Sequence, residues 1–182
     1  LQRKLRLESG HLLCRKVQKC ILRHFLLGKL MLNFENLDKF VFAGVGKYCI
    51  PQIESVKAYP HGEFIPMNFM RSEKSPQSKI MHCFTDDYQF ARFWNTPDRH
   101  VEKLSQFEAV CAPDFSMYTD MPLAMQIYNH YRKHWLAAYW QLNGLTVYPT
   151  ISWSDESSYE WCFDGEPRGS IVAVSNVGTQ KS

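Results

Sequence analysis

The chain lacks the motifs by which several large classes of enzyme are recognised. It contains no GxxxxGKS, GxxxxGKT or GxGxxG phosphate-binding loop and no GxSxG turn, which sets aside nucleotide-driven motors and ordinary serine hydrolases. Its six cysteines form no CxxC pair, and this spacing argues against a structural zinc site and a small disulfide scaffold. No apolar run approaches the ~18 residues that a membrane-spanning helix needs.

The cysteines that are present favour a reducing environment. Cys83 and Cys111 stand inside short apolar runs, where a reduced thiol behaves as a small hydrophobic side chain. The charged N-terminal segment has no signal-peptide core. We therefore expect a cytoplasmic protein in which these two thiols are buried.

The chain has 182 residues, of which 45% are hydrophobic and 14% aromatic, values that predict one folded domain with a real core. Its basic residues are unevenly distributed. Residues 1–30 hold eight Lys or Arg against one Glu, although the whole chain carries only +3. Apolar side chains at helical spacing predict a basic amphipathic helix there. It is either a tail that binds nucleic acid or a membrane surface, or an accessory extension outside the native domain.

The rest of the chain divides into two regions. Residues 31–78 are interrupted by proline and glycine, and only the runs at Val41 and Phe64 suggest extended or packed segments. Residues 79–182 alternate regularly between apolar runs and helical patterns. Strands are predicted at 79–84, 108–113, 145–151 and 170–175, with helices at 85–94, 98–106, 119–143 and 154–163.

This alternation predicts an α/β fold whose mostly parallel strands are joined by crossover helices. The chain stops seven residues after Ser175, so no helix follows the last strand. We expect either a fragment of a larger TIM-barrel-like or doubly wound sheet, truncated at its C-terminus, or a sheet whose last strand the N-terminal segment covers.

The longest helix is expected to begin after a cap at Thr119 or Asp120 and to end at Gly144. Its apolar stripe predicts a structural cover for the sheet. The stripe consists of Ala124, Ile127, Tyr128, Tyr131, Trp135, Ala138, Tyr139 and Leu142. His130 and His134 have zinc-binding spacing, but Tyr131 stands where a metalloprotease has Glu, so a solvated face with Arg132 and Lys133 is favoured.

Polar side chains follow every predicted strand, and the carboxyl ends of parallel strands meet at one edge of a sheet. Asp114, Asp87 and Asp155 are the catalytic candidates, with Asp114 first because it follows a strand directly. Such carboxylates can hold a divalent cation such as magnesium, or divide into a raised-pKa acid and an ionised base. The ordinary alternative is that Asp87, Asp120, Asp155 and Glu156 cap helices.

The same edge supplies candidate binding residues. Trp153 can stack on a base or sugar ring or can cover the core, and Asn176 can expose backbone donors to an anion. The full set is Ser116, Tyr118, Asp120, Ser152, Trp153, Glu156 and Asn176. No metal ligands are assigned.

Four stretches carry a resemblance to a known family. They are FTDDYQFARFWNTPDR from Phe84, APDFSMYTDMPLAMQIYNHYRKHWLAAYWQLNG from Ala112, ISWSDE from Ile151 and FDGEPRGSIVAVSNVG from Phe163. The region from about Tyr48 to Gly178 resembles a bacterial, plasmid and phage family catalogued as domain of unknown function 4417. The resemblance implies a parallel α/β fold and an intracellular, mobile-genetic-element setting. It implies no catalytic residues, because the family has no accepted activity.

Three functions stay open at this point. The first is a metal-assisted hydrolase or nuclease of a phage or mobile element, with Asp114, Asp87 and Asp155 at the sheet edge. The second is a non-catalytic accessory protein that binds nucleic acid through residues 1–30. The third is a module that binds a host protein, with Trp153, Tyr118 and Trp161 as aromatic anchors.

Overall fold

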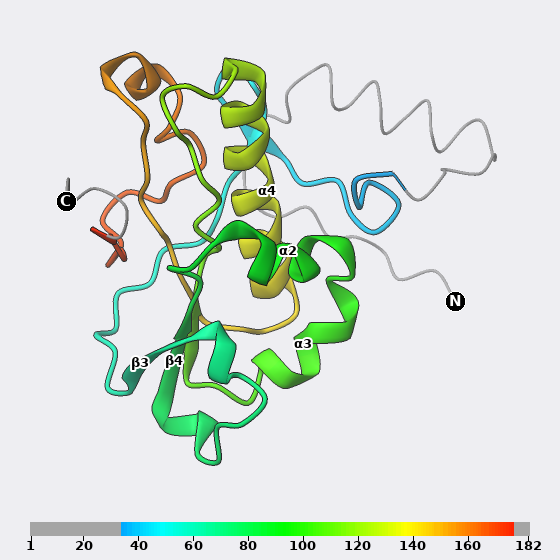
Figure 1. Cartoon of the computed structure of the whole chain (residues 1–182), viewed down its shortest axis with the longest axis vertical. Coiled ribbons are helices and arrows are strands. Elements are labelled where there is room, and N and C mark those ends of the chain that lie inside the picture. Colours follow the sequence, from blue (N-terminus) through cyan, green and yellow to red (C-terminus); the bar gives the residue numbers. More distant parts are fainter. Residues whose placement is uncertain (1–33, 177–182) are drawn as a thin grey trace.

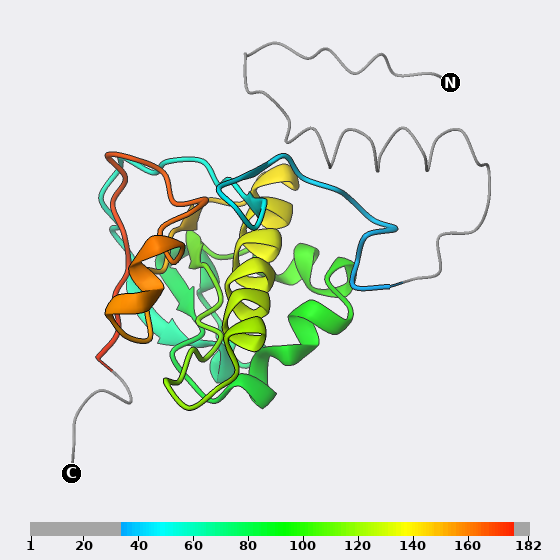
Figure 2. The same cartoon turned by 90° about the horizontal axis from the view of Figure 1, so that it is seen from above.

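The computed structural model of the chain describes residues 34–176, so the basic segment 1–30 lies outside the described residues. The elements are β1 (Gly44–Val45), β2 (Ile50–Pro51), β3 (Glu63–Pro66), η1 (Met67–Phe69), η2 (Pro76–Ser78), β4 (Lys79–His82), α2 (Asp87–Asn95), α3 (Asp98–Leu104), β5 (Ala109–Cys111), α4 (Leu123–Leu142), β6 (Val147–Tyr148) and η3 (Glu156–Glu160). Figures 1 and 2 show how they are arranged.

The central sheet is parallel, as the sequence predicts. It has four strands in the order β3-β4-β5-β6, and each neighbouring pair is parallel. The order follows the sequence without a reversal, so right-handed crossovers place the connecting helices on one face. Within residues 34–176 the sheet stays open and does not close into a barrel.

The two ends of the sheet differ from the sequence prediction. β3 forms one edge, although the sequence indicated only an extended or packed segment around Phe64. At the other edge, the strand expected at 170–175 is reduced to one parallel bridge between Thr150 and Ala173. The helix expected at 154–163 is the short 3-10 helix η3.

The main core lies between the sheet and its helices. Alternate strand residues Met81, Val110 and Val147 pack in one cluster with Phe93 of α2 and Trp135 of α4. The residues between them face the other side, where Ile80, Ala109, Cys111 and Tyr148 form a smaller cluster with Val56, Ile171 and Ala173. Strands buried on both faces explain the short, continuously apolar runs in the sequence. Cys83 and Cys111 are buried, as predicted.

The C-terminal part of helix α4 lies beside the sheet, and its N-terminal part extends beyond the sheet (Figure 1). The prediction that Thr119 or Asp120 caps it is wrong, because Pro122 occupies the N-cap position and no side chain caps the helix. Proline disfavours helical backbone in the residue before it, so the helix cannot extend back through Met121. The predicted stop is confirmed, since Gly144 follows the helix with a φ of +85°, a conformation that favours glycine.

Candidate functional site

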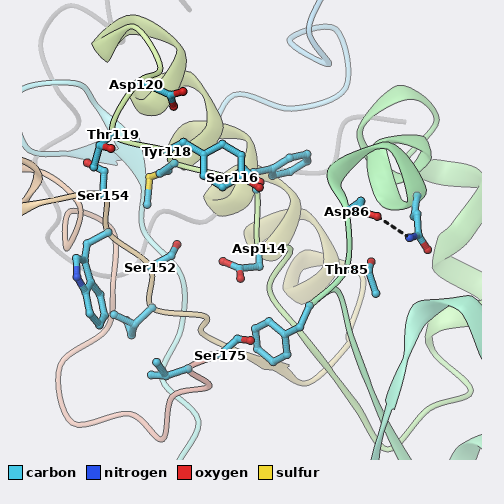
Figure 3. A pocket seen from close by; sticks show the side chains of 17 residues that line it. Thr85, Asp86, Asp114, Ser116, Tyr118, Thr119, Asp120, Ser152, Ser154 and Ser175 are labelled. Carbon is cyan, nitrogen blue, oxygen red and sulfur yellow. Dashed lines mark hydrogen bonds between the residues drawn. The ribbon is translucent and has the colours of Figure 1, made fainter. Parts of the chain in front are cut away.

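A cleft of about 950 Å³ opens at the carboxyl edge of the sheet. We call it the rim cleft. The loops after β4, β5 and β6 all contribute to its walls, together with Val174 and Ser175. Most of the side chains labelled in Figure 3 are hydroxyls and carboxyls. Helices cross back over a parallel sheet from this edge, so loops collect there and leave a cavity between them.

The structure brings together many of the predicted site residues and leaves others outside. Those that line the rim cleft are Asp114, Ser116, Tyr118, Asp120, Ser152 and Trp153. The residues not among its lining are Asp87, Asp155, Glu156 and Asn176. The cleft is therefore built around the loop after β5 and the start of the loop after β6.

Asp114 lies among the lining residues of the rim cleft (Figure 3). Burial raises the pKa of its carboxyl, and the charge of Asp87 adds to that rise. The charge of Lys133 and a hydrogen bond with Ser152 act in the opposite direction, but the net pKa stays above the ordinary value. A carboxyl with a raised pKa beside a cavity is typical of a group that gives and takes protons.

Asp87 holds the Asp114 loop from the side of α2. Its carboxylate accepts hydrogen bonds from the Ser116 backbone N–H at 3.1 Å and from the Ser116 hydroxyl at 2.8 Å. From the side of α4, the Asn129 side-chain amide donates to the Ser116 carbonyl at 2.6 Å. The guanidinium of Arg132 lies 4.0 Å from the centre of the Phe115 ring, a cation–π distance. These contacts fix the backbone on which Asp114 stands.

Asp155 and Glu156 belong to a helix end. The Asp155 side chain accepts a hydrogen bond from the Ser157 N–H at 2.9 Å and so caps η3, while Glu156 lies in the first turn. Hydrogen bonding from Ser157 lowers the pKa of Asp155. The capping role foreseen as the ordinary alternative therefore describes Asp155.

The face of α4 that packs inward is only partly the one predicted, since Trp135 and Ala138 of the predicted stripe are buried in the main core. The predicted stripe is partly solvent-facing, with Ala124, Tyr128 and Leu142 exposed. The prediction that His130, His134 and Lys133 form a solvated face of α4 is wrong, since all three are buried. The inward residues of the first half of α4 are Gln126, Asn129, His130, Lys133 and His134, which we call the polar stripe.

Each member of the polar stripe bonds to a backbone carbonyl of a loop or short strand. Gln126 donates to Met121, Asn129 to Ser116 and Lys133 to Thr150, while ring nitrogens of His130 and His134 lie 2.9 Å and 3.0 Å from the carbonyls of Asp164 and Pro51. Buried backbone carbonyls need donors. The polar stripe supplies them where no strand can.

Lys133, His134 and Glu166 form a buried charged group at the centre of this stripe. The Glu166 carboxylate lies 3.0 Å from the Lys133 ammonium and 3.1 Å from the His134 ring. Burial works to raise the pKa of Glu166, but the charge of Lys133 and the hydrogen bond from His134 hold it below the ordinary value. Burial lowers the pKa of both His130 and His134. At His134 the contacts with the Glu166 carboxylate and the Pro51 carbonyl oppose that shift, because oxygens against both ring nitrogens favour the protonated ring. Lys133 and Glu166 form the buried ion pair of this group.

Aromatic side chains stand at the mouth of the rim cleft. Trp153 is 45% exposed and Tyr118 is 63% exposed, so both can contact a bound molecule. Trp161, predicted as a third exposed anchor, is instead buried with Met117 and Cys162.

Neither a metal centre nor a membrane span stands out. Within residues 34–176, no group of three or more His, Cys, Asp and Glu side chains is arranged to hold a metal ion. No helix in the same part of the chain is both long and apolar enough to cross a bilayer.

The sequence analysis missed Lys133 and Glu166 as residues connected to the site. Gln126, Asn129, His130, Lys133 and His134 repeat at helical spacing as regularly as the apolar stripe does. That periodicity could have indicated a buried polar face, but a charged stripe on a helix usually faces water. Glu166 lies in a Gly- and Pro-containing turn with no periodic pattern at all.

Fold and site together define an α/β protein with an open parallel sheet and a carboxyl-lined cleft at its carboxyl edge. The chain belongs to the family described as Domain of unknown function (DUF4417), whose model matches residues 42–182. This confirms the resemblance found in the sequence.

Two phage proteins are similar to the chain. The Gene 1 protein of Mycobacterium phage L5 is 37% identical over 147 residues, which cover 79% of this chain and 63% of that protein. The Gene 1 protein of Mycobacterium phage D29 is 41% identical over 102 residues, covering 56% of this chain and 38% of that protein. The match thus spans less than two thirds of either relative. No solved structure matches the chain.

Proposed function

We propose that the chain is a phage-type hydrolase that binds a neutral, hydroxyl-bearing ring compound in the rim cleft and uses Asp114 as its general acid. A glycoside, including a nucleoside, is the substrate class that fits this description. The observation that carries the proposal is the position of Asp114, a carboxyl with a raised pKa among the hydroxyl groups that line the cleft.

The charge of the lining supports a neutral substrate. Asp86, Asp114 and Asp120 line the cleft, and none of its lining residues in the described part of the chain is Lys, Arg or His. A phosphate group would meet carboxylates and no cation there, which costs electrostatic energy. Hydroxyl groups, by contrast, can bond to the Ser116 and Ser152 side chains without a net charge.

The aromatic mouth supports a ring-shaped substrate. Trp153 and Tyr118 expose large parts of their rings beside the polar lining. Aromatic rings stack on bases with about 1–3 kcal/mol per base. The two side chains can therefore hold a ring while the hydroxyl groups orient it.

The proposed reaction follows from these positions. Protonated Asp114 donates its proton to the leaving oxygen or nitrogen as the glycosidic bond breaks, and water adds to the ring carbon. A second lining carboxylate, Asp86 or Asp120, accepts the proton of that water. Asp114 then regains a proton from solvent, and the second carboxylate releases its proton to solvent, so that one water is consumed for each bond broken.

The direct test is hydrolysis of 4-nitrophenyl glycosides and unmodified nucleosides by the full chain and its Asp114→Asn variant. We expect Asp114→Asn to lower kcat by about 10²- to 10⁴-fold, the usual contribution of a general acid. Asp155→Asn is the matched control, because Asp155 caps η3 outside the cleft lining, and it should keep the wild-type rate. Equal rates for the two variants, or no turnover of any compound, would contradict the proposal.

Stability gives a second test that needs no substrate. Because the folded pKa of Asp114 is raised, its contribution to stability is full below the unfolded value of about 3.9 and is lost as the pH rises through the folded pKa. Asp114→Asn should therefore be more stable than wild type at pH 7. Urea unfolding should show this difference in stability at pH 7 and its disappearance below about pH 3.9.

A metal-assisted nuclease is the second candidate, because Asp86, Asp114 and Asp120 line one cleft. Within residues 34–176 no three such side chains are arranged to hold a metal ion, so this candidate needs a nucleic-acid phosphate among the ligands. In that case magnesium, bound with a nucleic-acid phosphate, would supply the missing positive charge. The two candidates separate on one comparison: magnesium-dependent cleavage of single- or double-stranded DNA supports the nuclease, whereas turnover of neutral glycosides in EDTA supports the first proposal.

Two non-catalytic partners remain proposals. Nucleic-acid binding rests on the basic residues 1–30, and its affinity should fall steeply with added salt and vanish when they are deleted. Host-protein binding rests on exposed Trp153 and Tyr118, and alanine at both positions should abolish capture of that partner from host lysate.

A further inference from the structure

Lys133 is an unusual residue for the inner face of a helix. It is 2% exposed, and its ammonium group donates to the Thr150 carbonyl at 2.8 Å and to the Glu166 carboxylate at 3.0 Å. A buried lysine is costly unless it is fully paired. An apolar residue of similar length would cover the sheet without that cost, so the charge itself calls for an explanation.

The third contact of Lys133 points to that explanation. Its ammonium lies 3.5 Å from the Ser152 hydroxyl. Ser152 lines the rim cleft as Asp114 does, and its hydroxyl acts to lower the pKa of the Asp114 carboxyl. Lys133 itself is not among the lining residues. It therefore stands behind the wall of the cleft, one side chain removed from Asp114.

Few charged groups act on Asp114 from the elements around it. Lys133 of α4 and Asp87 of α2 are the charged groups that influence its carboxyl. The thiols of Cys83 and Cys111 also face it, but burial raises the pKa of both, so they stay uncharged near neutral pH. Within this set, Lys133 provides the positive charge.

We propose that Lys133 is a positioning residue for Asp114: it holds the Ser152 hydroxyl at the cleft wall, places a positive charge behind that wall, and is itself held by Glu166. The network runs from Glu166 through Lys133 and Ser152 to Asp114, and joins three loops that meet α4. The positive charge of Lys133 stabilises the ionised Asp114 carboxylate that remains after Asp114 has donated its proton. That catalytic consequence rests on the hydrolase function proposed above, whereas the electrostatic coupling does not.

The experiment is a carbon-13 NMR titration of the Asp114 side-chain carboxyl in the full chain. The double variant Lys133→Met/Glu166→Gln removes both buried charges with side chains of similar size, so neither charge is left unpaired. Glu166→Gln alone is the matched control, because it keeps the Lys133 charge. We expect Asp114 to titrate at a higher pH in the double variant than in the control.

Equal Asp114 midpoints in these two variants would overturn the proposal, because a merely structural role would affect both alike. If the double variant fails to fold, Ser152→Ala breaks the same connection without touching the ion pair. It should also raise the Asp114 midpoint above that of wild type, and an unchanged midpoint would overturn the proposal.

The titration needs no substrate, so it separates this inference from the proposed function. A shifted midpoint in a chain that hydrolyses none of the glycosides supports the network and contradicts the hydrolase. Activity that depends on Asp114, with an unshifted midpoint, supports the hydrolase and contradicts the network. If both hold, the pH optimum for hydrolysis should move upward in the double variant together with the midpoint.

Discussion

Helix α4 buries chemically opposite residues in its two parts. From its N-terminus to His134 the buried side chains are polar (Gln126, Asn129, His130, Lys133 and His134), whereas beyond His134 they are apolar (Trp135, Leu136, Ala137, Ala138 and Trp140). We call these parts the polar half and the apolar half of α4. A helix that follows a parallel strand runs back along the sheet, so its first half lies over the loops at the carboxyl edge. Strands satisfy one another's backbone groups, but buried loops do not.

Helix α4 therefore contributes both to the stability of the fold and to the site. The apolar half contributes to the main core with α2, α3 and one face of the sheet. The polar half binds the loops that form the rim cleft and fixes the Asp114 loop through Asn129 and Arg132. Loss of a residue from either half should therefore destabilise the fold, but only the polar half should affect Asp114.

The largest effect is expected from Lys133→Met alone. It leaves Glu166 buried without its cationic partner and leaves the Thr150 carbonyl without a donor, and such a loss typically costs about 3–5 kcal/mol. Urea unfolding measures it. Lys57→Met, at an exposed position, is the control and should stay within about 0.5 kcal/mol of wild type. A similarly small cost for Lys133→Met would mean that the buried pair is dispensable.

Leu136→Ala tests the apolar half. Leu136 is 0% exposed and lies in the main core, so the cavity should cost about 3 kcal/mol in unfolding free energy. The Asp114 carboxyl should nevertheless titrate at the wild-type pH in this variant. A displaced midpoint would show that the two halves of α4 are not separable.

Asn129→Ala should have a smaller effect on stability and a larger one on the site. It removes the donor to the Ser116 carbonyl, and an unpaired, partly buried carbonyl costs about 1–2 kcal/mol. Amide hydrogen exchange of the 114–118 loop should become faster than in wild type. Unchanged exchange in that loop would argue that Asp87 alone holds it.

Gly144→Ala should have the smallest effect. No atom lies within 4 Å of an added side chain, but the φ of +85° is strained for alanine, which costs about 1 kcal/mol. Thermal unfolding is the measurement. A cost as large as that of Leu136→Ala would show that the helix end is packed more tightly than the structure indicates.

The sequence predicts the order of the elements better than their inward faces. Continuous apolar runs located β4, β5 and β6, and helical patterns located α2, α3 and α4, because strands buried on both faces and amphipathic helices leave recognisable patterns. β3 was not predicted as a strand of this sheet, because its run contains Pro66 and the exposed Phe64. The polar stripe of α4 was not predicted to be buried, because its residues pair with loop carbonyls and such partners have no sequence pattern.

For the site, the sequence located the sheet edge and ranked Asp114 first, since a polar residue directly after a buried strand lies at that edge. Sequence spacing does not show which way a carboxyl points. It therefore kept Asp155, which caps η3, among the catalytic candidates beside Asp114, which lines the rim cleft. Lys133 and Glu166, 33 residues apart, meet only once the loop after η3 folds back onto α4.

The most direct test of this account is a carbon-13 NMR titration that resolves the side-chain carboxyls of Asp114 and Asp155 in the wild-type chain. Burial raises the pKa of Asp114, whereas hydrogen bonds from Ser157 lower the pKa of Asp155. We predict that Asp114 takes up its proton at a higher pH than Asp155. An Asp114 midpoint at or below that of Asp155 would contradict its role as the proton-carrying group of the rim cleft.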